Sequence, residues 1–265
     1  KKEKNCAIIP LLILCRKACL TEDKKMKIIV CENYEEMSKE GAKIIADLLK
    51  TKPQCVLGLA TGSTPVGMYK ELAAMNKAGE ISFKDVTSYN LDEYYPLAPT
   101  HDQSYRYFMN TNLFDHVDID KSRTHVPDGL AKDPAAMGQA YDAAIVAAGG
   151  IDLQVLGLGP NGHIAFNEPE EELYAGTHLT GLTESTIKAN SRSFEKIEDV
   201  PTQAVTMGIG SIMKARKIIV LASGKGKHPV IEKMLSGRIT TQCPGTLLLA
   251  HADVTLIVDK DAFEG

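Results

Sequence analysis

The fold is decided by the stretch GLGPNGHIAFNEP at residues 157–169, which directly follows an apolar run at residues 151–156. A short, β-rich apolar run of this kind is typical of a buried strand. The glycines after it allow the backbone to turn sharply where side chains would obstruct a ligand. In open α/β sheets, ligands bind beyond the carboxyl ends of the strands. The stretch holds one histidine, His163, and one carboxylate, Glu168, and is therefore a candidate edge of an active site.

From Met26 onward, apolar runs that resemble strands alternate with amphipathic runs that resemble helices. This alternation predicts an α/β fold, with an open, mostly parallel sheet and helices on both of its faces. No linker or internal repeat divides the chain after Met26, so we expect residues 26–265 to form a single α/β domain. The predicted strands, which we expect to form one sheet, lie at residues 27–31, 55–60, 85–89, 151–156, 217–222 and 254–258. The predicted helices lie at residues 34–50, 65–75, 105–114, 134–148, 183–190 and 228–236.

Residues 1–25 differ in composition from the rest of the chain. A lysine-rich start precedes an apolar run at residues 6–15, which loosely imitates a signal peptide. The run is too short for a membrane span, and no small-residue cleavage motif follows it. Met26, followed at once by an apolar strand, resembles a natural start. We therefore expect residues 1–25 to be a dispensable N-terminal extension that is not part of the fold.

The composition is that of an ordinary globular protein, with 44% hydrophobic and 24% charged residues. The formal net charge of −4 and the scattering of lysine and arginine argue against a nucleic-acid partner. The 6 cysteines include no CxxC pair, which argues against both a zinc site and a disulfide framework. We expect a protein that works in the reducing cytoplasm, with no metal and no membrane partner.

The loop TGST at residues 61–64 joins a predicted strand to a predicted helix. Small residues at this position offer backbone N–H groups, hydroxyl groups and the positive end of the helix dipole to an anion, most naturally a phosphate. Gly62, Ser63 and Thr64 are therefore candidates for phosphate binding, although an ordinary tight turn with an N-cap has the same pattern. The loop has neither the GxGxxG nor the Walker A spacing, which argues against a dinucleotide or ATP.

Two cations are candidates to complete such a phosphate site. Lys227 follows a predicted strand and a glycine-containing turn, and Arg192 ends the sequence ANSR. Ammonium and guanidinium groups are the side chains that phosphate recognition favours. The alternative for each is an ordinary solvated surface charge, which is what we expect for Lys225.

Two further groups could carry out proton transfer. Asp92 and Glu93 are adjacent at the end of a predicted strand, so they should point to opposite sides and only one should face the pocket. A carboxylate over a sugar phosphate can move a proton between adjacent carbons, although such a residue is also a common turn former. His163, oriented by Glu168, can relay protons near neutral pH. The alternative is a structural histidine bonded to a loop carbonyl, and the spacing of the pair does not suit two metal ligands on one helix face.

Four motifs stand together in the chain: GLATGSTP at 58–65, NLDEY at 90–94, NGHIAFNEP at 161–169 and ANSR at 189–192. In this order and spacing they resemble the glucosamine-6-phosphate deaminase family, over essentially the whole chain from Met26. The resemblance implies a Rossmann-like three-layer sandwich. It also implies the conversion of glucosamine 6-phosphate and water to fructose 6-phosphate and ammonia in amino-sugar catabolism, without a redox or metal cofactor.

Residue roles follow from the same resemblance. Asp92 would be the base that shuttles a proton between C2 and C1, His163 would assist opening of the pyranose ring, and Glu168 would orient and tune His163. The residues that would hold the phosphate are Gly62, Ser63, Thr64, Arg192 and Lys227.

The chain departs from parts of the family at two places. Some members carry aspartate where this chain has Asn161, and an asparagine cannot take up a proton, so we expect Asn161 only to form hydrogen bonds and to be tolerated. Members that are activated by N-acetylglucosamine 6-phosphate carry basic residues soon after the Glu-Pro pair, whereas residues 170–172 are EEE. An acidic cluster repels a phosphorylated effector, so we expect no such activation.

Two other functions stay open. The 6-phosphogluconolactonases share the architecture and a Gly-His motif, but the motifs NLDEY and FNEP favour the deaminase. A non-catalytic sugar-phosphate sensor is disfavoured by the retention of Asp92, His163 and Glu168 and by the lack of an attached DNA-binding module. In each case the partner is a small-molecule sugar phosphate. The chain ends soon after its last predicted strand, so we expect a monomer or a small homo-oligomer.

Overall fold

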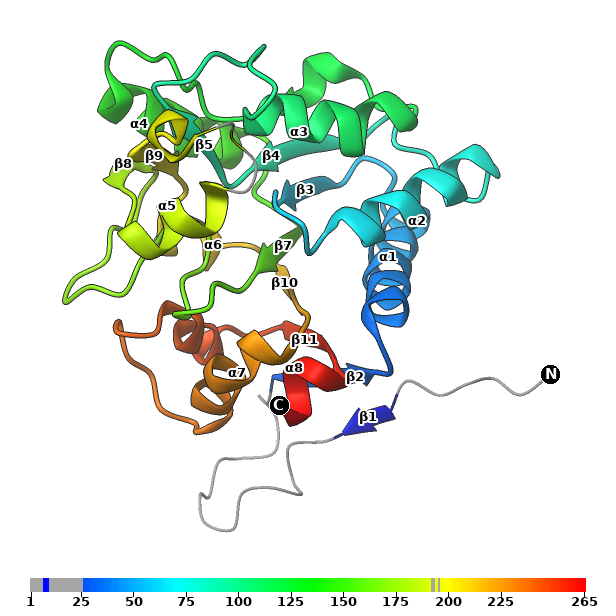
Figure 1. Cartoon of the computed structure of the whole chain (residues 1–265). Coiled ribbons are helices and arrows are strands. Elements are labelled where there is room, and N and C mark those ends of the chain that lie inside the picture. Colours follow the sequence, from blue (N-terminus) through cyan, green and yellow to red (C-terminus); the bar gives the residue numbers. More distant parts are fainter. Residues whose placement is uncertain (1–6, 10–25, 192–193, 195) are drawn as a thin grey trace.

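The computed structural model describes residues 7–9, 26–191, 194 and 196–265. Its main sheet and the helices around it form a three-layer α/β structure (Figure 1). The strands of the main sheet are β1 (Ala7–Ile9), β2 (Lys27–Cys31), β3 (Val56–Leu59), β4 (Thr87–Asn90), β6 (Thr124–His125), β7 (Leu153–Gly157), β10 (Lys217–Ala222) and β11 (Val254–Asp259). The helices are α1 (Tyr34–Thr51), α2 (Val66–Lys77), α3 (Tyr105–Asn112), α4 (Pro134–Ala147), α5 (Glu184–Asn190), α6 (Ile209–Ile212), α7 (His228–Leu235) and α8 (Lys260–Glu264).

Among the described residues the main sheet has the strand order β1-β2-β11-β10-β7-β3-β4-β6. Every neighbouring pair is parallel except β1 and β2, which are antiparallel. The predicted α/β class with a mostly parallel sheet is confirmed, and all six predicted strands lie in this one sheet. Most of them were predictable because strands buried on both faces read as continuous apolar runs, although β4 has the polar sequence TSYN. Every residue of β11, for example, is buried.

Helix α1 shows how the helical layer is formed. Asn33 caps its first turn by accepting a hydrogen bond from the Glu36 N–H at 2.9 Å. Its buried face, which includes Met37, Ile45 and Leu49, packs against β2, β10 and β11, and α2 packs against α1. The predicted helix boundaries agree with the structure to within a few residues. Pro65 is the N-cap of α2, and the strand predicted from residue 85 begins at Thr87.

The chain reverses its direction of travel across the sheet between β3 and β7. From β3 the chain adds β4 and β6 on one side, and from β7 it adds β10 and β11 on the other. Strands β3 and β7 pair only at Leu57 with Leu153 and at Gly58 with Gln154, so they separate toward their carboxyl ends. Such a switch point is where open α/β sheets form their ligand-binding crevice.

A second, antiparallel sheet lies beside the carboxyl end of β4 and was not predicted. Its strands are β5 (Asp92–Tyr95), β9 (Gln203–Thr206) and β8 (His178–Gly181), in that order. Strand β5 follows β4 after only Leu91, whose carbonyl accepts a hydrogen bond from the Met207 N–H at 2.7 Å. The sheet therefore fixes the first residue of β5, Asp92, at the crevice.

The N-terminal segment is described only at β1, where Ala7 pairs with Val30 and Ile9 with Ile28. That residues 1–25 are dispensable stays a prediction. No described helix is both long enough and apolar enough to cross a membrane.

Candidate active site

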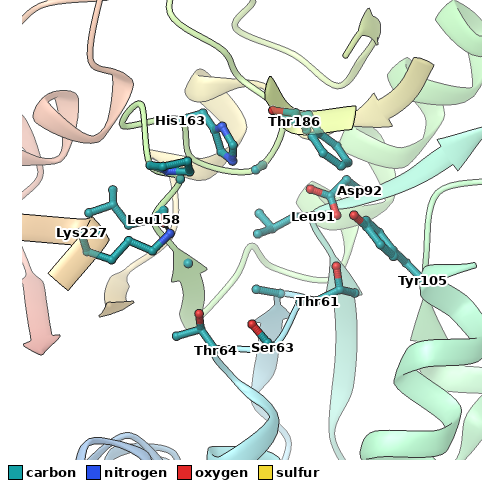
Figure 2. A pocket seen from close by; sticks show the side chains of 18 residues that line it. Thr61, Ser63, Thr64, Leu91, Asp92, Tyr105, Leu158, His163, Thr186 and Lys227 are labelled. Atoms are coloured by element: carbon teal, nitrogen blue, oxygen red, sulfur yellow. Dashed lines mark hydrogen bonds between the residues drawn. The ribbon is translucent and has the colours of Figure 1, made fainter. Parts of the chain in front are cut away.

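A cavity of about 560 Å³ lies at the carboxyl ends of β3, β4, β7 and β10. Its walls come from the loops that follow these four strands and from α3 and α5. Figure 2 shows Ser63 and Thr64 at one end, Asp92 and Tyr105 on one side, and His163 across from them. The switch point of the sheet thus gathers residues that are far apart in sequence around one space.

Contacts with α1 and α2 fix the loop that follows β3. Gly62 has φ +95°, in the left-handed region that favours glycine. The Tyr34 hydroxyl lies 3.1 Å from the carbonyls of both Ser63 and Thr64 and accepts a hydrogen bond from the Gly67 N–H at 2.8 Å. The Tyr34 hydroxyl thus ties this loop to α1 and α2, and Ser63 and Thr64 line the cavity.

Lys227 reaches the cavity from the short 3₁₀ helix Lys225–Lys227 after β10. Its ammonium group donates a hydrogen bond to the Leu158 carbonyl at 2.5 Å and points into the cavity (Figure 2). Burial lowers its pKa from the usual value. Lys225, expected to be a surface charge, is exposed. Arg192, the other candidate cation, lies outside the described residues.

Asp92 is 5% exposed and lines the cavity. Burial in this poorly hydrated position, with a smaller contribution from the negative charge of Glu93, raises the pKa of Asp92 to about 8. A carboxyl group with a pKa near the working pH can both take up and return a proton.

Glu93 points to the opposite side of β5, as its adjacency to Asp92 predicts. Its carboxylate accepts hydrogen bonds from the backbone N–H groups of Tyr105 at 2.8 Å and Arg106 at 3.0 Å, which are the first residues of α3. Burial raises the pKa of Glu93 to about 7, although these bonds oppose the shift. By capping α3, Glu93 fixes Tyr105, whose hydroxyl lies beside Asp92 (Figure 2).

The loop after β7 places His163 next to Glu168. The distance from His163 Nδ1 to Glu168 Oε1 is 3.2 Å, a close polar contact without good hydrogen-bond alignment. Glu168 Oε2 accepts a hydrogen bond from Asn161 Nδ2 at 2.6 Å, and Oε1 accepts one from the Thr186 hydroxyl at 2.5 Å. Burial alone would raise the pKa of Glu168, but His163, Thr186 and Asn161 together lower it to about 2. Glu168 is therefore a permanent anion beside the imidazole.

The backbone of this loop is shaped for the histidine. A side chain at Gly159 would collide with the ring, because its Cβ would lie 2.5 Å from three ring carbons of His163. Ala165 adopts φ +52°, which costs a non-glycine residue about 1–2 kcal/mol. The turn is closed by Asn167, whose side chain donates hydrogen bonds to the carbonyls of Ile164 at 3.0 Å and Met207 at 2.9 Å. Local strain held by buried bonds is typical of functional loops.

The structure brings the predicted residues Gly62, Ser63, Thr64, Asp92, His163 and Lys227 to the wall of one cavity, and it places Glu168 and Asn161 directly behind His163. Sequence analysis missed Thr61, Tyr105 and Thr186, which also line the cavity. Tyr105 and Thr186 lie in the first turns of α3 and α5, after the recognisable N-caps Ser104 and Thr183. Only the tertiary structure shows that they reach the site. Among the described residues, no group of three histidine, cysteine, aspartate or glutamate side chains is placed to hold a metal ion.

Comparison with known proteins gives three findings. Residues 32–257 match the family described as glucosamine-6-phosphate isomerases/6-phosphogluconolactonase. A glucosamine-6-phosphate deaminase of Clostridium perfringens is 62% identical over 237 residues, which cover 89% of this chain and 98% of the relative. A solved structure described as a monomeric glucosamine-6-phosphate deaminase of the NagB superfamily is 42% identical, with a TM-score of 0.87 over 89% of this chain and 98% of that one.

The fold extends to more distant proteins. The 6-phosphogluconolactonase of Trypanosoma cruzi is 22% identical, with a TM-score of 0.73 over 92% of this chain and 97% of that one. At this identity the likeness concerns the fold alone.

Proposed function

The chain belongs to the glucosamine-6-phosphate isomerase and 6-phosphogluconolactonase family, and we propose that it is the deaminating member, which converts glucosamine 6-phosphate and water to fructose 6-phosphate and ammonia. The observation that carries this proposal is the placement of Asp92. It is a buried carboxyl group with a pKa of about 8, across one cavity from His163 and beside a loop suited to phosphate.

Binding begins at the phosphate. The hydroxyl groups of Ser63 and Thr64 and the N–H groups of their loop are the donors, and Lys227 supplies a positive charge. Charge-assisted bonds of this kind are roughly twice as strong as neutral ones. Anchored at one end of the cavity, the sugar extends toward Asp92 and His163.

Ring opening is the task of His163. Glu168 stays ionised beside it and keeps the imidazole oriented, so His163 can exchange a proton with the ring oxygen and open the pyranose to its aldehyde form. Asn161 contributes by donating to Glu168 and accepting from the His163 backbone N–H at 3.1 Å.

Asp92 then performs the isomerisation. It removes the proton from C2 while the C1 aldehyde oxygen takes up a proton, which gives a C1–C2 enol. The C2 ammonium group then loses one proton and Asp92 returns its proton to C1, which leaves an iminium group at C2. Water adds to this iminium group and ammonia leaves, which gives the ketone. The substrate also brings a protonated amine to C2. A cation at this position favours the ionised form of Asp92, which is the form that acts as the base.

A lactone hydrolase is the second candidate because of the shared fold. Hydrolysis of a lactone moves no proton between carbons and brings no cation to Asp92. It therefore does not use the buried carboxyl group of Asp92. Ammonia release from glucosamine 6-phosphate and hydrolysis of 6-phosphogluconolactone, measured side by side, separate the two. We expect ammonia, and an Asp92→Asn variant that is slower by ~10²–10⁴-fold. Lactone hydrolysis without ammonia release contradicts the proposal.

A non-catalytic sugar-phosphate sensor is the third candidate. Calorimetry with glucosamine 6-phosphate, read together with the ammonia assay, tests it. Binding without turnover in the wild type would favour the sensor.

The proposal also includes the oligomeric state and the cellular location of the protein. We expect a monomer or small homo-oligomer, and light scattering on the purified full chain measures it. We also expect the reducing cytoplasm, since the described cysteines Cys55 and Cys243 are free and buried. Cell fractionation tests this location, and recovery of the activity outside the cytoplasmic fraction would contradict it.

A further inference from the structure

Thr186 makes a contact that the mechanism above does not use. It lies in the first turn of α5 and is 5% exposed. Its hydroxyl donates a hydrogen bond to Glu168 Oε1 at 2.5 Å, and the same oxygen lies 3.2 Å from His163 Nδ1. A helix outside the histidine loop is thus bonded to the carboxylate that faces the histidine.

The direction of this hydrogen bond is fixed by its surroundings. Glu168 is ionised, with a pKa of about 2, so it can only accept and the Thr186 hydroxyl must donate. The Thr186 oxygen in turn accepts from the Thr183 hydroxyl at 3.1 Å. Thr183 also accepts from the Thr186 N–H at 3.3 Å, as the N-cap of α5. Chains of hydrogen bonds polarise and strengthen one another, so the pair of threonines acts on Glu168 as a unit.

Each carboxylate oxygen of Glu168 therefore accepts a hydrogen bond from a different residue. Asn161, from the histidine loop itself, holds Oε2 at 2.6 Å, and Thr186 holds Oε1. With only the Asn161 bond, the carboxylate could turn about its last side-chain bond. With both bonds, Oε1 is held in the position from which it faces the His163 ring.

We propose that Thr186 is a positioning residue, whose hydroxyl holds Oε1 of Glu168 and so sets the orientation of His163 for proton transfer. The role in turnover rests on the proposed function, whereas the effect on the Glu168–His163 contact does not. Because Thr186 also lines the cavity, the competing explanation is direct contact with the substrate.

Steady-state kinetics of two variants test the role in turnover. Thr186→Val keeps the shape and removes the hydroxyl, and we expect kcat to fall about 10-fold or more with KM changed less than about twofold. Thr186→Ser keeps the hydroxyl and is expected to retain most of kcat. A Val variant with unchanged kcat, or one that changes only KM, overturns the proposal.

A double-mutant cycle separates action through Glu168 from direct contact with the substrate. On a Glu168→Gln background, Thr186→Val should cause little further loss of kcat, because the two residues act as one unit. Thr206→Val is the matched control: it removes another buried hydroxyl, which accepts from the Phe166 N–H of the same loop at 3.0 Å and makes no bond to Glu168. Its effect should add to that of Glu168→Gln. A full Thr186→Val effect on the Gln background overturns the proposal.

A spectroscopic measurement keeps the inference separate from the proposed function. Absence of ammonia release in the wild type would contradict the proposed function alone. The His163 imidazole ¹H–¹⁵N signals, assigned by their loss in His163→Gln, report the contact with Glu168 without turnover. We expect them to shift in Thr186→Val and to stay in place in Thr186→Ser and Thr206→Val. Signals that do not move in Thr186→Val overturn the positioning role, whatever the activity.

Discussion

The buried carboxyl group of Asp92 should make the protein less stable than its asparagine variant at neutral pH. Asp92 has a pKa of about 8 in the folded protein against 3.8 for the model group. Between these values the folded state holds a proton that the unfolded state has released, so stability rises as the pH falls from about 8 toward 4. One pKa unit corresponds to about 1.4 kcal/mol, and pH 7 lies about three units above the unfolded value, so the cost at pH 7 is up to about 4 kcal/mol. Asp92→Asn removes this cost.

Urea unfolding of the wild type and of Asp92→Asn at about pH 4.5, 7 and 8.5 measures the difference in their free energies of unfolding. The asparagine variant should be the more stable at pH 7 and 8.5, with a difference that shrinks toward pH 4.5. Asp118→Asn is a control for which we expect the opposite sign. Partial burial raises the pKa of Asp118, but hydrogen bonds from Ser82, the Phe83 N–H and Asn76 outweigh this effect and hold the pKa below its usual value. That variant should lose stability at pH 7. An Asp92→Asn variant no more stable than the wild type at pH 8.5, or a difference independent of pH, would refute the reasoning.

Four further outcomes are expected. Because the base must be ionised, kcat/KM of the wild type should fall as the pH decreases below about 8, and a flat profile of initial rates from pH 6 to 9 would contradict the role of Asp92. Lys227→Met should raise KM by ~10–100-fold and change kcat much less, whereas an unchanged KM would remove Lys227 from the phosphate site. Asn161→Asp places a second carboxylate 2.6 Å from Glu168, which raises the pKa of Glu168 above about 2, so turnover should not increase; a gain of orders of magnitude would show that Asn161 limits the enzyme. N-acetylglucosamine 6-phosphate should leave the rate curve hyperbolic because residues 170–172 are exposed glutamates, and a sigmoidal curve that this effector makes hyperbolic would be evidence against that expectation.

The main sheet was predictable because burial on both faces leaves a strong signal. Strands such as β10 and β11 are continuous apolar runs, and a glycine-containing turn marks the carboxyl end of β10. The second sheet left no such signal. Its strands are four residues each, and β5 begins with two carboxylates and β8 with a histidine. Strand β5 pairs with β9 across about 108–114 residues of sequence and β8 pairs with β9 across about 22–28, and only the tertiary structure specifies these pairings.

The site shows the same division. Motifs on loops after strands predicted Asp92, His163 and Glu168, because the topology of a parallel sheet brings such loops together. The partners of these residues were not predictable. Tyr105 reaches the cavity because Glu93 caps α3. That contact depends on the side of β5 to which Glu93 points, which only the tertiary structure shows.

Transfer of a labelled proton tests the central claim most directly. Glucosamine 6-phosphate deuterated at C2 should give ammonia together with fructose 6-phosphate that carries part of the deuterium at C1, because one carboxyl group, Asp92, removes and returns the proton. NMR of the product detects the label, and Asp92→Asn should slow both the transfer and the release of ammonia by ~10²–10⁴-fold. Ammonia release at close to the wild-type rate in Asp92→Asn, or wild-type fructose 6-phosphate that carries no deuterium at C1, would contradict the account.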